Sequence, residues 1–108
     1  MEQRRTRRFQ LQLPLSITRS GAERVAFPGL TKNISSNGVL FTTKYEPDFG
    51  GGSIEYIITL NHDGSPSVSL RCVGKVVRLE RADSLAEENS SGYRVAATLE
   101  RYEFVRQR

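Results

Sequence analysis

The sequence predicts an all-β domain, and three observations lead to this prediction. Apolar residues alternate with polar residues over several short stretches, which is the period of a half-buried β-strand. Clusters of Gly, Pro, Asn, Asp and Ser separate these stretches. The chain has 108 residues, 37% of them hydrophobic and 26% charged, which suits a single compact domain. Six or seven short strands joined by turns indicate a small antiparallel barrel or sandwich.

The first predicted strand covers residues 9–17, where apolar side chains occupy every second position. Pro14 falls on the outward set, and because it lacks an N–H group we expect an edge strand or a β-bulge there. Residues 20–22 read as a tight turn, and residues 23–27 as a short return strand that Pro28-Gly29 ends.

The middle of the chain repeats this pattern of strands and turns. Residues 31–43 hold two apolar patches, separated by the turn formers Ser35-Ser36-Asn37-Gly38. A break at residues 48–52 precedes an alternating strand over residues 53–60, and residues 61–66 have the composition of a hairpin loop.

The longest strand pattern runs from residue 68 to residue 79 and changes phase. Its apolar residues are even-numbered at first and odd-numbered later, so a β-bulge is expected at the intervening Gly74. Residues 82–92 are polar and read as a loop, and residues 93–99 alternate as the last strand. The tail over residues 100–108 is compatible with either helix or strand.

The excess positive charge is concentrated at the N-terminus. The formal net charge is +4, and residues 1–24 hold six arginines but only two glutamates. The most basic part is Arg4-Arg5-Thr6-Arg7-Arg8. Taken alone, this segment is a solvated basic arm or a recognition element for an anion or a guanine, because the arginine fork matches both.

The supply of reactive side chains argues against catalysis. The chain has one histidine, His62, in a predicted loop, and one cysteine, Cys72, on an apolar phase of a strand. Metal sites usually need three or four ligands, so no metal site and no cofactor are expected. A lone cysteine forms no internal disulfide, and neither a signal peptide nor an apolar run of about 20 residues is visible. We expect a cytoplasmic protein that is not an enzyme and has no membrane span.

Two short motifs are weak signals separately but are informative as an ordered pair. Arg4-x-x-x-Arg8 stands before the first strand, and Asn33-x-Ser35-x-x-Gly38 follows in the turn region. This ordered pair in an all-β chain resembles the PilZ domain family, and the resemblance extends over essentially the whole chain.

The resemblance implies a six-stranded antiparallel β-barrel that binds cyclic di-GMP. Residues 1–8 would form a flexible arginine-rich arm, residues 9–99 the barrel and residues 100–108 a short C-terminal segment. Carried over by position, the ligand-binding residues are Arg4, Arg8, Asn33, Ser35 and Gly38. Arg5 and Arg7 fall on variable positions of the family motif, where they would either steer phosphates or simply be solvated.

The chemistry of the matched residues agrees with such a ligand. Arginine forks suit two phosphates, and the oxygens of Asn33 and Ser35 can accept from the guanine N1 and N2 donors. Asn33 stands where the family more often has aspartate, so a neutral hydrogen bond of about 1 kcal/mol replaces a charge-assisted one of about 1.5–3 kcal/mol. We expect Gly38 to supply a positive φ or room for the ligand.

These observations favour a cyclic di-GMP receptor whose N-terminal arm rearranges on binding and which signals to a separate partner protein. One alternative is a small β-barrel that binds nucleic acid through the arm, although three aromatic residues fall on core phases rather than on a stacking face. The other is a PilZ-like interaction domain that binds no nucleotide. The complete arginine arm argues against that second alternative.

Overall fold

The computed structural model describes residues 12–45, 52–60, 67–85 and 90–107, and these residues form strands and turns without a helix. Seven strands follow one another along the chain: β1 (Pro14–Ser20), β2 (Glu23–Ile34), β3 (Gly38–Thr43), β4 (Ser53–Thr59), β5 (Ser67–Leu85), β6 (Ser90–Thr98) and β7 (Arg101–Gln107). Within the described ranges, no helix has the length and apolar character needed to cross a membrane.

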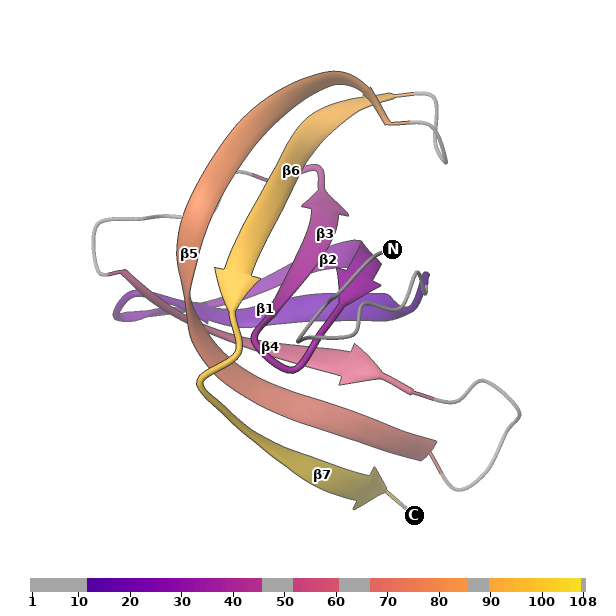
Figure 1. The fold of residues 1–108 in the computed structure, drawn as a ribbon, viewed down its shortest axis with the longest axis vertical. Helices are drawn as coiled ribbons and strands as arrows, with labels where there is room; N and C mark the ends of the chain where they lie inside the picture. Colours follow the sequence, from indigo (N-terminus) through magenta and orange to yellow (C-terminus); the bar gives the residue numbers. More distant parts are fainter. Residues whose placement is uncertain (1–11, 46–51, 61–66, 86–89, 108) are drawn as a thin grey trace, which may run out of the picture.

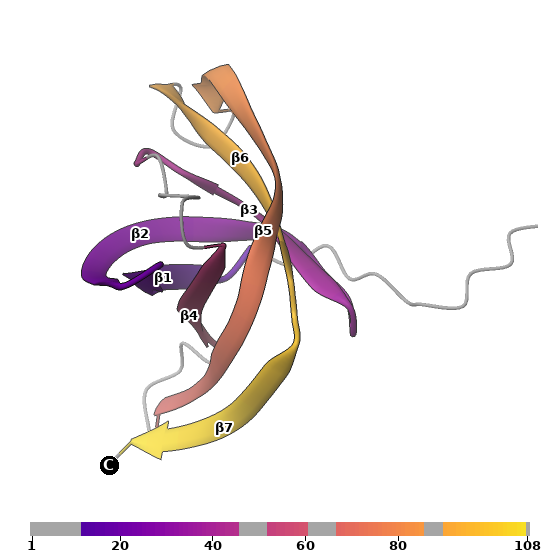
Figure 2. The same cartoon turned by 90° about the vertical axis from the view of Figure 1, so that its left-hand side faces the viewer.

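Six of the strands close into a barrel. The strand order is β4-β1-β2-β3-β6-β5, and an additional pairing of β4 with β5 completes the ring. Every pairing is antiparallel. The long, curved β5 holds β6 along one half and β7 along the other (Figures 1 and 2). The expected six-stranded barrel is confirmed, with β7 as an additional strand.

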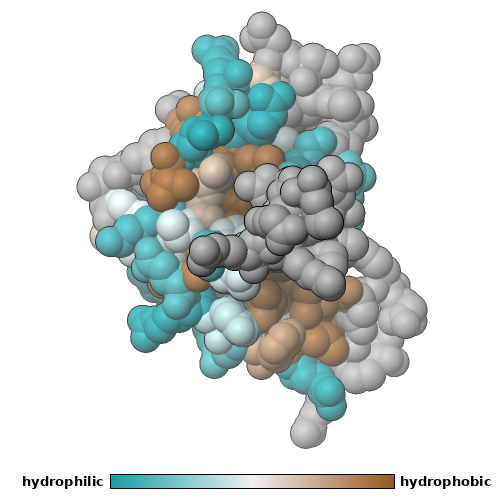
Figure 3. Space-filling view, in the orientation of Figure 1, coloured by the Kyte–Doolittle hydropathy of each residue, from teal (hydrophilic) through white to brown (hydrophobic). Residues whose placement is uncertain are grey.

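The core follows from the alternation along the strands. In β4 every second side chain is buried, and similar inward sets from the other strands meet it inside the barrel. The most completely buried apolar side chains are Ile17, Phe41, Ile54, Tyr56, Ile58, Cys72 and Val95. Apolar side chains also reach the surface in the lower half of Figure 3, in the region where Figure 1 draws β4, β5 and β7.

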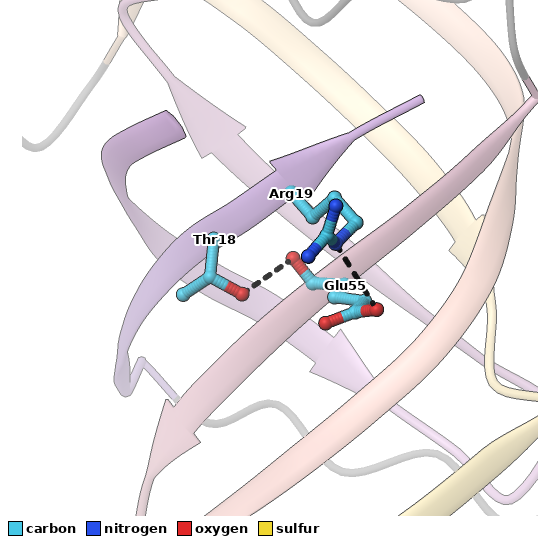
Figure 4. Close-up of polar contacts among 3 residues, drawn as sticks. All are labelled: Thr18, Arg19 and Glu55. Carbon is cyan, nitrogen blue, oxygen red and sulfur yellow. Dashed lines mark hydrogen bonds and ion pairs between the residues drawn. The ribbon is translucent and has the colours of Figure 1, made fainter. Parts of the chain in front are cut away.

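Strand β1 is central, because it pairs with β2 on one side and β4 on the other. The expectation that Pro14 marks an edge strand or a bulge is therefore wrong: it is the first residue of β1, where proline is tolerated. The bulge of β1 lies between Ile17 and Arg19. There the Thr18 hydroxyl donates to the Glu55 carbonyl at 3.3 Å, and Arg19 forms an ion pair with the Glu55 carboxylate at 3.5 Å (Figure 4).

Strand β2 does not end at Pro28-Gly29 as the sequence predicted. It continues to Ile34, and Pro28 still lies opposite Ser16 of β1. Its pairing with β3 begins only at Gly29, so the missing N–H of Pro28 breaks no hydrogen bond on that side. Instead the Pro28 carbonyl accepts from the Thr43 hydroxyl at 2.9 Å. The turn at residues 20–22 is confirmed, with Gly21 at φ 62°.

Strand β5 has its bulge three residues after the position predicted from sequence. Gly74 lies in an unbroken register with β4, and the shift against β6 falls between Val76 and Arg78. Gly74 instead permits a close approach, because a Cβ there would lie 1.8 Å from the carbonyl oxygen of Thr98. Val77, which the pattern placed on the inward phase, is 66% exposed.

The C-terminal part contains more strand than the sequence suggested. Residues predicted as a loop extend β5 to Leu85 and begin β6 at Ser90. Residues 100–108, which read as helix or strand, supply β7, so β6 is not the last strand. The predicted loop at 61–66, most of the break at 48–52 and the first residues of the predicted first strand lie outside the described residues.

Candidate functional site

The turn between β2 and β3 is organised by one serine. The Ser35 hydroxyl accepts from the backbone N–H groups of Asn37 and Gly38, each at 3.2 Å, and donates to the Gly38 carbonyl at 3.3 Å. The backbone N–H of Ser35 also donates to the Gly38 carbonyl, at 2.9 Å. These contacts occupy the one donor and both acceptor positions of a hydroxyl group. Ser35 therefore shapes this loop directly.

A β-bulge turns Asn33 to the outside of the barrel. The register of β2 against β3 shifts between Thr31 and Asn33, so Thr31 lies opposite the buried Phe41 while Asn33 lies opposite Leu40. Without the extra residue, Thr31 and Asn33 would share one face of the strand, because side chains alternate with period two. The bulge thus keeps Thr31 in the core and presents the Asn33 amide outward.

A second bulge does the same for Arg78. Val76 lies opposite the buried Ala97, whereas Arg78 lies opposite Ala96, with Val77 as the extra residue between them. Ala96 is in turn the partner of Leu40 on β3. The four outward side chains therefore form one row across β2, β3, β6 and β5: Asn33, Leu40, Ala96 and Arg78. Its ends are roughly 14 Å apart at about 4.8 Å per strand.

Two neighbouring hollows lie on this outer face. The first, of about 360 Å³, is lined by Asn33, Ser35 and Gly38 together with Val77, Arg78 and the small residues of β6. The second, of about 470 Å³, is lined by Gln12, Lys32, Asn33, Leu40 and Arg94. Asn33 and Leu40 line both hollows, so the end of the row formed by β2 and β3 lies between them. The structure thus brings Asn33, Ser35 and Gly38 together.

The charged side chains that line the hollows are all basic within the described part of the chain. Arg78 is the charged residue of the first hollow, and Lys32 and Arg94 are those of the second. Arg94 also forms an ion pair with Glu80 at 3.3 Å, which offsets part of its charge. Guanidinium and ammonium groups bind phosphate oxygens, while Leu40 and Val77 offer apolar contact to a planar base. The face suits an anionic ligand with aromatic bases.

The chain enters the barrel beside the second hollow. The backbone N–H of Leu13 donates to the Thr31 hydroxyl at 2.9 Å, and the N–H of Thr31 donates to the Leu13 carbonyl at 3.0 Å. Arg8 precedes Gln12 by four residues in the sequence. The side chains predicted on the arm, Arg4, Arg5, Arg7 and Arg8, lie outside the described residues.

The structure explains the glycine at position 38 by close packing and not by the positive φ that was expected. The φ of Gly38 is not in the positive region, in contrast to Gly21 and Gly52. A Cβ on Gly38 would lie 2.8 Å from the carbonyl oxygen of Ala97 on β6, so the glycine allows close strand packing beside the first hollow. The room at this backbone is taken by the neighbouring strand β6, and room for a ligand stays a prediction.

Sequence reasoning missed the part of this face that comes from β5 and β6. The family resemblance extends to Gly74-Lys75-Val76-Val77-Arg78 without assigning any of these residues to the site. Strand pairing brings Arg78 and Ala96 into one row with Asn33, and Arg94 lines the second hollow with it. The phase change in β5 was the available signal. A phase change at Gly74 predicts Val77 inward and Arg78 outward, but nothing in the sequence indicates that this outward position lies in one row with Asn33.

Comparison with protein-family models places residues 2–100 in the PilZ domain. This match covers the arm motif, the turn motif and all six strands of the barrel. The family is known for binding cyclic di-GMP and is a family of binding domains rather than catalysts. Comparison with curated proteins and with solved structures gave no match.

Proposed function

Because the chain belongs to the PilZ domain family, we propose that it is a receptor for cyclic di-GMP and that the ligand lies across the row from Asn33 to Arg78. The observation that carries this proposal is the pair of bulges that turn these two side chains onto one basic face. Each bulge reverses the phase of its strand, so the two together place Asn33 and Arg78 on the same outward face.

Each group on this face has a role suited to its chemistry. The side-chain amide oxygen of Asn33 accepts hydrogen bonds from the N1 and N2 donors of a guanine. Arg78 binds a phosphate or the O6 and N7 edge of a guanine. Ser35 and Gly38 hold the loop in shape through their mutual hydrogen bonds. Leu40 and Val77 pack against the base faces, and Ala96 leaves space between them.

The arginine arm completes the proposed site. Arg4 and Arg8 clamp the phosphates from the side of the second hollow, where the chain enters at Gln12. Arg5 and Arg7 raise the local positive potential and steer the anion. The switch is a rearrangement of this arm, because moving charged residues over the barrel changes the surface that a separate partner protein meets.

Calorimetric titration with cyclic di-GMP tests the proposal. We expect a dissociation constant in the micromolar range or tighter, equivalent to about −8 kcal/mol. Arg8→Ala should weaken binding at least tenfold. Cyclic di-AMP should bind poorly, because adenine carries a donor where guanine carries O6. Equal affinity for the two dinucleotides would refute the assignment.

The salt dependence of binding separates this function from nucleic-acid binding. A polynucleotide releases many counterions, so its affinity falls steeply with salt, whereas a ligand with two phosphates gives a shallow slope. Two of the exposed aromatic rings in the described ranges, Tyr102 and Phe104, lie on β7 and not beside the two hollows. This arrangement favours the dinucleotide over a single-stranded nucleic acid stacked on aromatic platforms.

A further inference from the structure

Strand β7 is the end of the sheet among the described strands. It pairs with β5 through residues Arg101–Gln107, and no second described strand lies beyond it. It is exposed on both faces, since all its described side chains except half-buried Val105 are exposed. An uncovered edge strand presents a row of N–H and C=O groups that another strand can pair with.

The direction of these groups follows from the hydrogen bonding of β5. Leu60 donates to the Val68 carbonyl at 2.9 Å, so in β5 the even-numbered residues from Val68 direct their backbone groups toward β4. The odd-numbered residues of β5 therefore face β7 and bond to its odd-numbered residues. It follows that Tyr102, Phe104 and Arg106 direct their N–H and C=O groups to the free edge.

The same three residues have side chains on one face of β7. Tyr102 is 58% exposed and Phe104 is 69% exposed, and their rings meet edge to face with centroids 6.3 Å apart. Arg106 follows two positions later, on the same face and also exposed. The edge thus combines a free backbone row with an aromatic pair and a cation.

We infer that a second copy of this chain covers the edge by antiparallel pairing of its own β7, with the twofold axis through Phe104. In this register Phe104 lies opposite the partner's Phe104, and Tyr102 lies opposite the partner's Arg106. All three outward-directed residues then bond across the axis. The aromatic rings meet as a hydrophobic cluster, and each Arg106 lies against a Tyr102 ring in a cation–π contact.

The side chains of β7 favour this register over the two neighbouring ones. A shift of the partner by two residues in one direction would put Val105 at the axis and separate the two Phe104 side chains. A shift in the other direction would keep the backbone pairing but would place Glu103 directly opposite the partner's Glu103. Like charges in that position destabilise a strand pair. With the axis at Phe104, Glu103 lies opposite the partner's Val105 and keeps its ion pair with Arg71 at 3.1 Å. The surface is self-complementary, as a twofold interface requires.

Sedimentation analysis over a range of protein concentrations tests the dimer. We expect the average mass to rise toward that of two chains as concentration increases. Phe104→Glu should hold the protein at the mass of one chain, because two carboxylates would then face each other at the axis. Ala26→Glu, which adds the same charge at an exposed position of β2, is the control and should dimerise like the wild type.

Cysteine crosslinking tests the register separately. Residues directly opposite in a hydrogen-bonded pair have Cα atoms about 5.5 Å apart, within the range of a disulfide. Phe104→Cys should therefore form a crosslinked dimer on mild oxidation. Arg101→Cys should not, because its two copies would lie roughly 20 Å apart along the paired strands. The native Cys72 is fully buried and does not interfere.

Three results would overturn the inference. A single-chain mass at every concentration would mean that no second copy covers the edge and would leave it to another strand or helix. A dimer that persists in Phe104→Glu would use a different surface. Equal crosslinking of the two cysteine variants would exclude a register centred on Phe104. None of these results depends on the binding of cyclic di-GMP.

Discussion

Asn33 on β2 and Arg78 on β5 lie in the same outward row of the barrel, although 45 positions separate them in the sequence. Each follows a β-bulge that reverses the phase of its strand. The amide and the guanidinium are thereby placed on one face with Leu40 and Ala96 between them.

Replacing Arg78 by glutamine should weaken binding of cyclic di-GMP at least tenfold. The substitution removes a charged group whose hydrogen bonds to an anion contribute about 1.5–3 kcal/mol. Arg78 is exposed at the bulge, so the stability of the barrel should change little. Calorimetric titration measures the affinity. Arg24→Gln, at an exposed position near the start of β2, is the matched control and should bind like the wild type.

Substitutions at Asn33 should distinguish a ligand contact from a scaffold role. Asn33→Asp should keep or improve the affinity, because a carboxylate accepts more strongly from guanine donors. Asn33→Leu should impair binding while the barrel stays folded, since the side chain points outward and is only half-buried. Thermal unfolding of both variants provides the correction for stability. If both then bind alike, Asn33 belongs to the turn and not to the ligand site.

Gly74→Ala should destabilise the barrel by about 3 kcal/mol, the upper part of the usual range for overpacking. The new Cβ would lie 1.8 Å from the Thr98 carbonyl oxygen, and that carbonyl already accepts from the Tyr56 hydroxyl at 2.9 Å. Backbone must therefore move. Chemical denaturation measures the loss of free energy of unfolding.

Gly52→Ala is the comparison for this prediction. Nothing lies within 4 Å of its added Cβ, but its φ of +81° is unfavourable for alanine. The expected cost is about 1–2 kcal/mol, from conformation alone. An equal loss in the two variants would contradict the crowding argument for Gly74.

The free energy of unfolding should fall as the pH rises above about 9. Burial raises the pKa of the Cys72 thiol to about 12 from its ordinary value of 9.0. Burial, together with the nearby Cys72 and Glu100, raises the pKa of the Tyr56 phenol above its ordinary 10.0. The folded state holds both protons more tightly than the unfolded state, so this stabilisation is complete below the unfolded values and declines through the range above them.

Denaturation at increasing pH checks this alkaline loss, and Tyr56→Phe isolates one contributor. The variant should lose about 1 kcal/mol at neutral pH, because the hydrogen bond to Thr98 is removed. Its further decline with pH should be shallower than that of the wild type. Parallel pH profiles for the two proteins would show that the Tyr56 phenol contributes nothing to the dependence.

The strands that alternate cleanly were predictable from sequence. β4 has one buried and one polar face, so period two reveals it directly, and the turn from Ser35 to Asn37 has the residues that its hydrogen bonds require. The prediction of a closed barrel rested on the resemblance of the two motifs to those of the PilZ domain family. Local patterns alone left a sandwich open, because closure depends on the pairing of β4 with β5, which is not encoded within either strand.

The errors have a common physical origin in strand partners that the sequence does not show. Pro28 is tolerated inside β2 because β3 pairs only from Gly29 onward. Glycine is required at position 74 because the Thr98 carbonyl lies too close for a Cβ, and no bulge is present there. The bulge at Val77 is defined by the register against β6, and it is this bulge that adds Arg78 to the candidate site. The basic arm and the turn motif can be recognised in the sequence. The part of the candidate site that β5 and β6 contribute can be recognised only once the strand pairing is known.

Backbone amide NMR spectra recorded during titration with cyclic di-GMP test the central claim most directly. The largest shifts should map to the outward row and its loop, from Asn33 to Gly38 and from Val77 to Arg78, with Ala96 between them. The amides of β4 and β7, away from this face, should stay nearly unchanged. No shifts at all, or shifts centred on β4 and β7, would contradict the account.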